Sequence, residues 1–345
     1  MEFLLKSVRI GAVAMVIVGF GIDASYGQGQ GGESPRTPWG DPDLQGRFTN
    51  KTITPFERPA DLAGKEFLTV EEAAELEQER AAENAARDDQ VPADIVGNYN
   101  THWFDRGTTV VGTRRTSIIV DPPDGRLPSL TIEAEKNAPS ADEVRRLEGA
   151  RRGNGLINTW TDLDLNDRCI LWPTAGPPML SSAYNNNYQI LQAPGYVAIV
   201  IEMIHDVRII PLDGRPHVGP GVRQWLGDSR GHWEDDTLVI ETTNFSDKTV
   251  IRAANNAQPT EALRVVERFR RVSTDTLEYS FTIEDPKTWE RPWTGEVPWM
   301  RTSDNLYEYG CHEGNYSMAT MLDFASARPS ALARFAVVIT SSNPT

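Results

Sequence analysis

Histidine and cysteine are scarce in this chain, and several catalytic signatures are missing from it. The 345 residues include five histidines and two cysteines. They contain no P-loop, no HExxH zinc motif and no dinucleotide-binding glycine fingerprint following a strand. The histidines are scattered without metal-ligand spacing, so the sequence predicts no organic cofactor and no dedicated metal site. A metal remains an alternative only if His205, His312 and Glu202 converge in the fold.

Long apolar runs are lacking as well. The longest, residues 10–22, is shorter than the roughly 20 residues that a membrane-spanning helix needs. It follows Lys6 and Arg9 and precedes small residues, which is the order of a cleavable signal peptide over residues 1–27. We therefore expect a periplasmic or extracellular protein that is not inserted in a membrane after cleavage. An uncleaved anchor is the alternative.

Positive charge is in deficit. Lys and Arg number 34 against 49 Asp and Glu, which gives a net charge of −15. Such a surface repels nucleic-acid phosphates and anionic lipid headgroups. Among partner classes, this charge excludes nucleic acid and favours a small-molecule ligand or substrate.

The two cysteines, Cys169 and Cys311, both follow the signal peptide. Exported chains meet an oxidising compartment in which disulfides persist. The sequence therefore predicts a disulfide between them, with two buried thiols as the alternative.

Strand-type patterns dominate what is present. Residues 276–284 alternate strictly, with Leu277, Tyr279, Phe281 and Ile283 on one face and polar residues on the other. Further strands are predicted at residues 116–120, 188–192, 196–211 (one long strand or a strand pair), 223–227, 237–244, 263–272 and 305–311.

Short turns join these predicted strands, which favours an antiparallel meander. A long meander leaves exposed edges unless it closes on itself. The sequence therefore predicts a mainly β fold: an up-and-down barrel, lipocalin-like by analogy, with at least eight antiparallel strands from residues 110–315. A two-sheet sandwich is the runner-up.

The predicted organisation has three parts. A signal peptide (1–27) precedes a leader and N-terminal arm (28–68), which would pack outside the barrel or across a mouth. Residues 69–345 form one barrel domain with helical insertions. Two short helices are predicted after capping boxes that begin at Thr69 and Ser140.

The densest polar cluster runs from Glu202 to Arg208, within the apolar stretch 196–210. Strand alternation would place Glu202, Asp206 and Arg208 on one face and His205 on the other. Charged groups buried there must be paired or have shifted pKa values. Either this cluster supplies an acid or base, or it is a structural ion pair of Arg208 with Asp206 or Glu202 beside a core histidine.

If His205 lies on the other face of this strand, its imidazole needs a hydrogen-bond partner from another strand. Glu241, Glu267 and Glu313 are the candidates for His205. His312 forms a second acid–base candidate, because it lies between Cys311 and a glutamate at a predicted strand end.

Two loops are candidates for binding a ligand. Tyr99, Trp103 and Arg114 belong to an aromatic and charged stretch that suits a lid over a pocket or a structural clasp. Asn186 lies among three consecutive asparagines, which bind a ligand or form a turn.

Six long motifs resemble those of a family of exported bacterial proteins with no assigned activity. They are TPWGDPDLQG at 37–46, EMIHD at 202–206, GDSRG at 227–231, ETTNF at 241–245, DPKTW at 285–289 and CHEGN at 311–315. The resemblance covers nearly the whole chain after the signal peptide. The resemblance implies export and one shared architecture. It provides no catalytic role that could be carried over to residues of this chain.

Two functions remain. The favoured one is a cofactor-free acid–base enzyme, a hydrolase, lyase or isomerase, acting on an apolar or aromatic molecule inside the barrel. The alternative is a non-catalytic carrier of a hydrophobic ligand. The catalytic candidates are His205, His312, Glu202 and Asp206, and the substrate-binding candidates are Arg208, Tyr99, Trp103, Arg114 and Asn186.

Overall fold

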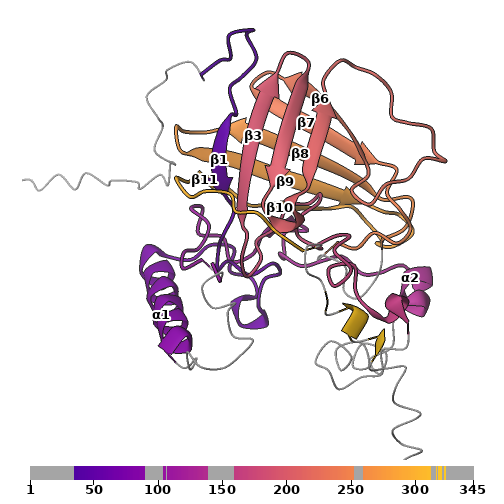
Figure 1. Cartoon of the computed structure of the whole chain (residues 1–345). Helices are drawn as coiled ribbons and strands as arrows, with labels where there is room; N and C mark the ends of the chain where they lie inside the picture. The colour runs from indigo at the N-terminus through magenta and orange to yellow at the C-terminus, as the bar shows by residue number, and fades with distance from the viewer. Residues whose placement is uncertain are drawn as a thin grey trace, which may run out of the picture. The chain divides into compact units, whose positions relative to one another are not determined.

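An antiparallel sheet curls into a nearly closed barrel (Figure 1). The computed structural model describes residues 35–89, 104–105, 107–138, 159–251, 259–311, 316, 318–320 and 322–323. The strand order is β5-β4-β3-β1-β11-β9-β8-β7-β6, with β10 paired to β9 and to β2. The elements are β1 Gly46–Thr49, α1 Val70–Asp89, β2 Ile119–Asp121, α2 Ile132–Asn137, β3 Asn187–Ala193, β4 Tyr196–Ile201, β5 Val207–Pro211, β6 Asp228–Glu234, β7 Thr237–Thr243, β8 Arg264–Arg271, β9 Thr276–Glu284, β10 Trp293–Glu296 and β11 Trp299–Arg301.

The structure confirms the predicted barrel. Every pairing between these named strands is antiparallel, and ten of the strands fall within residues 110–315. The end strands β5 and β6 pack through side chains: Ile210 lies so close to Gly231 that a Cβ atom there would be 2.8 Å from its Cγ2. Glycine at this position lets the two ends of the sheet approach each other.

The N-terminal arm contributes a strand to the barrel, although we expected it outside or across a mouth. β1 inserts between β3 and β11, where Phe48 lies opposite Tyr188 on one side and Arg301 on the other. The Phe48 side chain is fully buried, and the guanidinium groups of Arg271 and Arg301 lie 5.7 and 5.2 Å from its ring centroid. Aromatic burial and cation–π contact thus hold the arm in the sheet.

Two predicted strands are wrong. Residues 223–227 form only an isolated bridge, and the strand β6 begins at Asp228, where a turn was predicted. Residues 305–311 contain no strand, and β10 and β11 complete this part of the sheet instead. Pro292 and Pro298 flank β10, and no strand was predicted between them.

The first predicted helix is confirmed as α1. Its capping box forms as expected, because the Thr69 backbone N–H donates to Glu72 and the Glu72 N–H donates to Thr69 Oγ1. The second predicted helix falls in residues 139–158, outside the described residues. α1 and α2 lie at the end of the barrel where β1 and β4 finish and β3 begins, which we call the mouth (Figure 1).

Candidate functional site

Aromatic side chains fill the barrel interior. Trp299 stacks on Tyr188 with ring centroids 4.4 Å apart, and Phe269 stacks on Tyr279 at 4.6 Å. None of these four side chains is more than 2% exposed. The interior, where we expected a ligand, is therefore occupied by a close-packed core.

A buried ion pair crosses this core. Arg208 Nη1 donates to Glu267 Oε1 at 3.0 Å, and Nη2 donates to Oε2 at 2.5 Å. The Tyr279 hydroxyl donates to the same carboxylate at 2.8 Å, and burial raises its pKa well above the usual value. Arg208 is thus paired with Glu267, and neither Asp206 nor Glu202 is its partner. Glu267 therefore binds the Arg208 guanidinium and the Tyr279 hydroxyl. It does not pair with His205, for which it was one of three candidate partners.

The motif at residues 227–231 reads G-x-S-x-G, but it is not a nucleophile elbow. Ser229 lies inside strand β6, whereas the elbow needs a strand-to-helix turn that exposes the hydroxyl. Its Oγ is buried 3.2 Å from Arg208 Nη2 and 2.9 Å from Thr242 Oγ1. The serine helps to satisfy Arg208 and has the environment of a structural group.

The stretch from Glu202 to Asp206 is a turn at the mouth, not part of a strand. A short 3-10 helix at Met203–His205 separates β4 from β5, and Ile204 and His205 have left-handed φ angles of 62° and 50°. The predicted strand pair over 196–211 is confirmed, but alternation does not extend through this turn. The expected faces of Glu202 and His205 were therefore wrong.

Glu202 fastens this turn to its neighbours. Its carboxylate accepts hydrogen bonds from the backbone N–H groups of Asn187, at 3.2 Å, and Tyr307, at 3.0 Å. Burial raises the pKa of Glu202, and these two hydrogen bonds oppose the rise. Glu202 is only 3% exposed, so its role in the structure is to position three chain segments.

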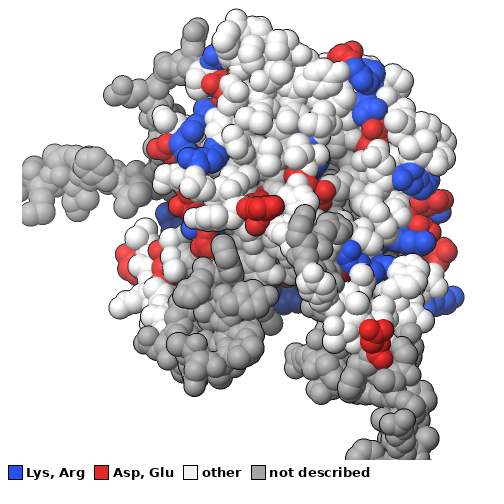
Figure 2. All heavy atoms as spheres, viewed as in Figure 1, with Lys and Arg blue, Asp and Glu red and all other residues white. Residues whose placement is uncertain are grey.

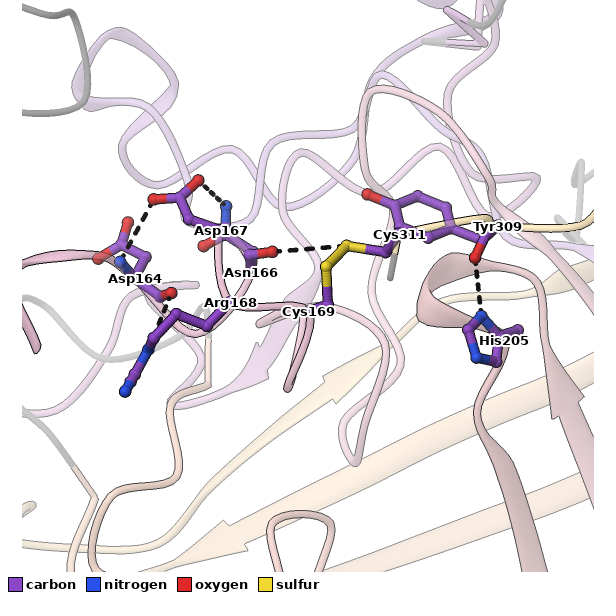
Figure 3. The surroundings of a disulfide bond; sticks show 8 residues. All are labelled: Asp164, Asn166, Asp167, Arg168, Cys169, His205, Tyr309 and Cys311. Carbon is purple, nitrogen blue, oxygen red and sulfur yellow. Dashed lines mark hydrogen bonds between the residues drawn. A yellow bond between two sulfur atoms is a disulfide. The ribbon is translucent and has the colours of Figure 1, made fainter. Parts of the chain in front are cut away.

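His205 is exposed at this turn, although we expected a buried imidazole. Its Nδ1 lies 2.8 Å from the backbone carbonyl oxygen of Tyr309 (Figure 3). A carbonyl only accepts, so Nδ1 carries the proton and the basic lone pair of the neutral ring is on Nε2. The partner of Nδ1 is thus a backbone carbonyl outside the strands, and not a glutamate on another strand as we expected.

The predicted disulfide holds that carbonyl in position. Cys169 and Cys311 are bonded, and Cys311 lies two residues beyond Tyr309 (Figure 3). A cross-link 142 residues apart in sequence thus ties the segment that contacts His205 to the loop that contains Asn166 and Cys169.

Asp206 is the second titratable group of the turn. Burial raises its pKa, and the nearby His205 partly opposes this. Its Oδ2 is buried and has no hydrogen-bond partner within the part of the chain that the structure describes. A carboxyl in this setting is suited to exchange protons nearer neutral pH than an ordinary aspartate.

A cleft of about 260 Å³ also opens at the mouth. Its described walls combine apolar and hydroxyl-bearing side chains, and none of them is charged. They are Thr52, Thr54, Phe56, Ile118, Leu180, Ser181, Ser182, Ala183 and Val297. The volume is near the lower end of ligand pockets, which span roughly 300–1,000 Å³, and the mixed lining is typical of them.

Asn186 connects the cleft wall to the turn. Its side chain accepts from the Ser182 N–H at 2.6 Å and donates to the carbonyl oxygens of Ser182 and Asp105. The next residue, Asn187, donates its backbone N–H to Glu202. Asn186 therefore supports the cleft wall, and its side-chain amide forms hydrogen bonds with the backbone.

The remaining candidates are separate from this arrangement or outside the described residues. Arg114 has a left-handed φ of 57°, and its Nε donates to the Leu68 carbonyl beside α1. His312, Tyr99 and Trp103 lie outside the described residues. The action of His312 beside His205 and the lid formed by Tyr99 and Trp103 therefore stay predictions.

Sequence reasoning missed a histidine clamp on the outer surface. His217 Nδ1 lies 3.0 Å from Asp228 Oδ2, and Nε2 lies 3.3 Å from Glu241 Oε1. Arg264 binds the same Glu241 carboxylate. These contacts hold the loop between β5 and β6 on the sheet. Glu241 was a candidate partner for His205, and it pairs with His217 instead.

Comparison with known proteins provides no relative from which a role could be transferred. No protein-family model, no curated protein and no solved structure matches this chain. Among the described residues, no cluster of three or more His, Cys, Asp or Glu side chains could hold a metal ion. Within the same residues, no helix has the length and apolar character needed to cross a membrane.

Proposed function

We propose that this protein is an exported barrel that binds a small, uncharged and largely apolar molecule in the cleft at its mouth. The observation that carries the proposal is the cleft itself, which pairs apolar walls with hydroxyl groups while the barrel interior is filled. Hydroxyl groups fix the orientation of a ligand, and apolar walls supply most of its affinity. The signal-like N-terminus and the Cys169–Cys311 disulfide support export, to the periplasm or beyond.

Two of the hydroxyl groups are already oriented by the backbone. Thr54 Oγ1 accepts from the Val111 N–H at 2.9 Å, so its own proton points elsewhere. Thr52 Oγ1 donates to the Thr109 carbonyl at 3.0 Å and accepts from the Thr54 N–H at 3.2 Å, so it offers its second lone pair. A ligand with one hydrogen-bond acceptor and one donor on an apolar frame fits this pair.

A screen of small-molecule extracts tests the proposal. The purified protein is incubated with extract, separated from unbound compounds, and analysed by native and denaturing mass spectrometry. We expect retention of neutral compounds of low polarity with one molecule per chain. Retention of charged or strongly polar compounds alone would contradict the proposed chemistry.

Acid–base catalysis is a second candidate function. It rests on one observation: His205 has a fixed tautomer and lies beside Asp206, whose buried carboxyl has a raised pKa. Such pairs are over-represented at active sites. In this proposal Nε2 of His205 takes a proton from a bound molecule and Asp206 returns one, with no organic cofactor. Membership of the family with the CHEGN and EMIHD motifs is a further proposal, and it would extend either function to its other members.

A further inference from the structure

One side of the barrel presents an apolar face to its surroundings. In β3, β4 and β5 the side chains that point away from the core are almost all hydrophobic. The apolar face consists of Leu191, Tyr196, Ala198, Val200, Val207 and Ile209. In Figure 2, viewed from this side, the upper centre of the molecule is nearly bare of Lys, Arg, Asp and Glu.

The strand register makes this face continuous. Leu191 pairs with Ala198, which pairs with Ile209. In the neighbouring row Val200 pairs with Val207 on one side and with the polar Gln189 on the other. Leu191, Val207 and Ile209 are 44%, 49% and 56% exposed. Apolar side chains that are adjacent and this exposed mark an interaction surface, whereas scattered ones do not.

The opposite half of the barrel has the usual polar exterior. Arg264 binds Glu241 and Glu284 across β7, β8 and β9, and Arg270 binds Glu278. The two halves belong to the same sheet, so the difference comes from residue choice and not from strand geometry. The apolar face is therefore built to be covered.

The sequence beyond the last described residue contains a matching segment. Residues 335–340 read FAVVIT, an uncharged run rich in β-branched residues. The only charged residues after Asp323 are Arg328 and Arg334, whereas the whole chain carries a net charge of −15. Two basic residues that precede an apolar run complement an acidic protein with one uncharged face.

The chain between the last described residue and this apolar run has a long reach. Asp323 follows Leu322, which packs against Leu163 near the disulfide-linked loop. Eleven residues, 324–334, separate Asp323 from the apolar run and span up to roughly 36 Å when extended. The longest strand, the nine-residue β9, measures about 30 Å.

We propose that residues 335–340 dock on the apolar face of β3–β5 of their own chain. By strand alternation, Phe335, Val337 and Ile339 would face the barrel together. The segment removes the exposed side chains of Val207 and Ile209 from water and tethers the C-terminal part of the chain to the sheet.

A double-mutant cycle in the full chain tests this contact. The first variant is Ile209→Lys, the second combines Val337→Lys with Ile339→Lys, and the third carries all three changes. Denaturant unfolding and binding of an apolar dye are measured for each. We expect the first two to raise the unfolding equilibrium constant roughly tenfold or more, as for exposing one or two aliphatic side chains, and to increase dye binding. The third should match the more destabilised of the two.

Val266→Lys, on the outer face of β8 among charged residues, is the matched control. Its effect should add to that of the tail variant. Additive effects of Ile209→Lys and the tail variant, or a tail variant equal to the parent protein, would overturn the proposal. Sedimentation of the same proteins tests whether a second copy of the chain occupies the apolar face instead. Dimers that Ile209→Lys disrupts and the tail variant leaves intact would overturn the proposal in favour of that second copy.

Discussion

Arg208 and Glu267 form a two-point ion pair across the barrel core, from β5 at one end of the sheet to β8 in the opposite half. Their side chains are 3% and 0% exposed. Removing one partner leaves an uncompensated buried charge, and we expect Glu267→Gln to lower the free energy of unfolding by about 3–5 kcal/mol. Urea denaturation at pH 7 measures the effect.

A double variant is the control for this prediction. Arg208→Met combined with Glu267→Gln removes both charges while the amide oxygen can still accept from the Tyr279 hydroxyl. It should be more stable than Glu267→Gln alone. A double variant less stable than both single variants would show that the charges do not act as a pair.

The second prediction concerns the disulfide. It closes a loop of 142 residues, so Cys169→Ser should lower stability by up to about 5 kcal/mol in the chain-entropy model. Cys311→Ser should have the same effect, since either change opens the same loop. Thermal unfolding with and without reductant checks this, and unreduced protein should show no thiol reactive to labelling. Two labelled thiols in the folded protein would refute the assignment.

The pH dependence of stability follows from Asp206. Its pKa is raised in the folded state by burial, so above the ordinary value of 3.8 the unfolded chain loses this proton before the folded chain does. The contribution of Asp206 to stability is therefore largest below that value and is lost as pH rises through the folded pKa. As the pH rises from 3.5 to 7, the free energy of unfolding of Asp206→Asn should therefore increase relative to that of the parent protein.

Chemical denaturation at both pH values measures that difference. Glu202, whose pKa is also raised, is present in both proteins and cancels from the comparison. A difference between the two proteins that is independent of pH would show that Asp206 titrates in the same way in the folded and unfolded chains.

A substitution of His205 distinguishes the catalytic function from binding alone. If Nε2 is the base, His205→Asn should abolish turnover of any discovered substrate and lower stability by only about 1–3 kcal/mol, because one hydrogen bond to Tyr309 is lost. His232, exposed on β6, provides the matched control His232→Asn, which should retain activity. A folded His205→Asn protein with full activity would remove this residue from the mechanism.

Local patterns predicted the elements whose signals are local. The alternation at residues 276–284 became β9, and the Thr69–Glu72 capping box became the start of α1. The disulfide was predicted from the oxidising compartment that an exported chain meets and from the presence of two cysteines. Each of these depends on few residues close in sequence or on chemistry that has one economical solution.

Long-range choices were beyond the sequence. Alternation left one long strand or a strand pair open over residues 196–211. The chain reverses at Ile204 and His205, which both have left-handed backbone angles, and the strand pair results. Histidine adopts such angles more often than most residue types, but the β-branched Ile204 rarely does, so the pair gave no turn signal in the sequence. The partners of Arg208 and His217 also depend on which strands meet. For that reason Glu267 and Glu241 were proposed as partners of His205, whereas Glu267 binds Arg208 and Glu241 binds His217.

The central claim is that the mouth cleft holds the ligand, and one matched pair of variants tests it most directly. Ala183 is exposed and lines the cleft, so Ala183→Trp fills it at little cost to folding. Ala193, at the far end of β3, is also exposed and does not line the cleft, so Ala193→Trp makes the same change elsewhere. The measurement is calorimetric affinity for a compound retained in the extract screen. We predict at least a tenfold loss with Ala183→Trp and unchanged affinity with Ala193→Trp. Equal affinity in both variants would contradict the assignment of the cleft as the binding site.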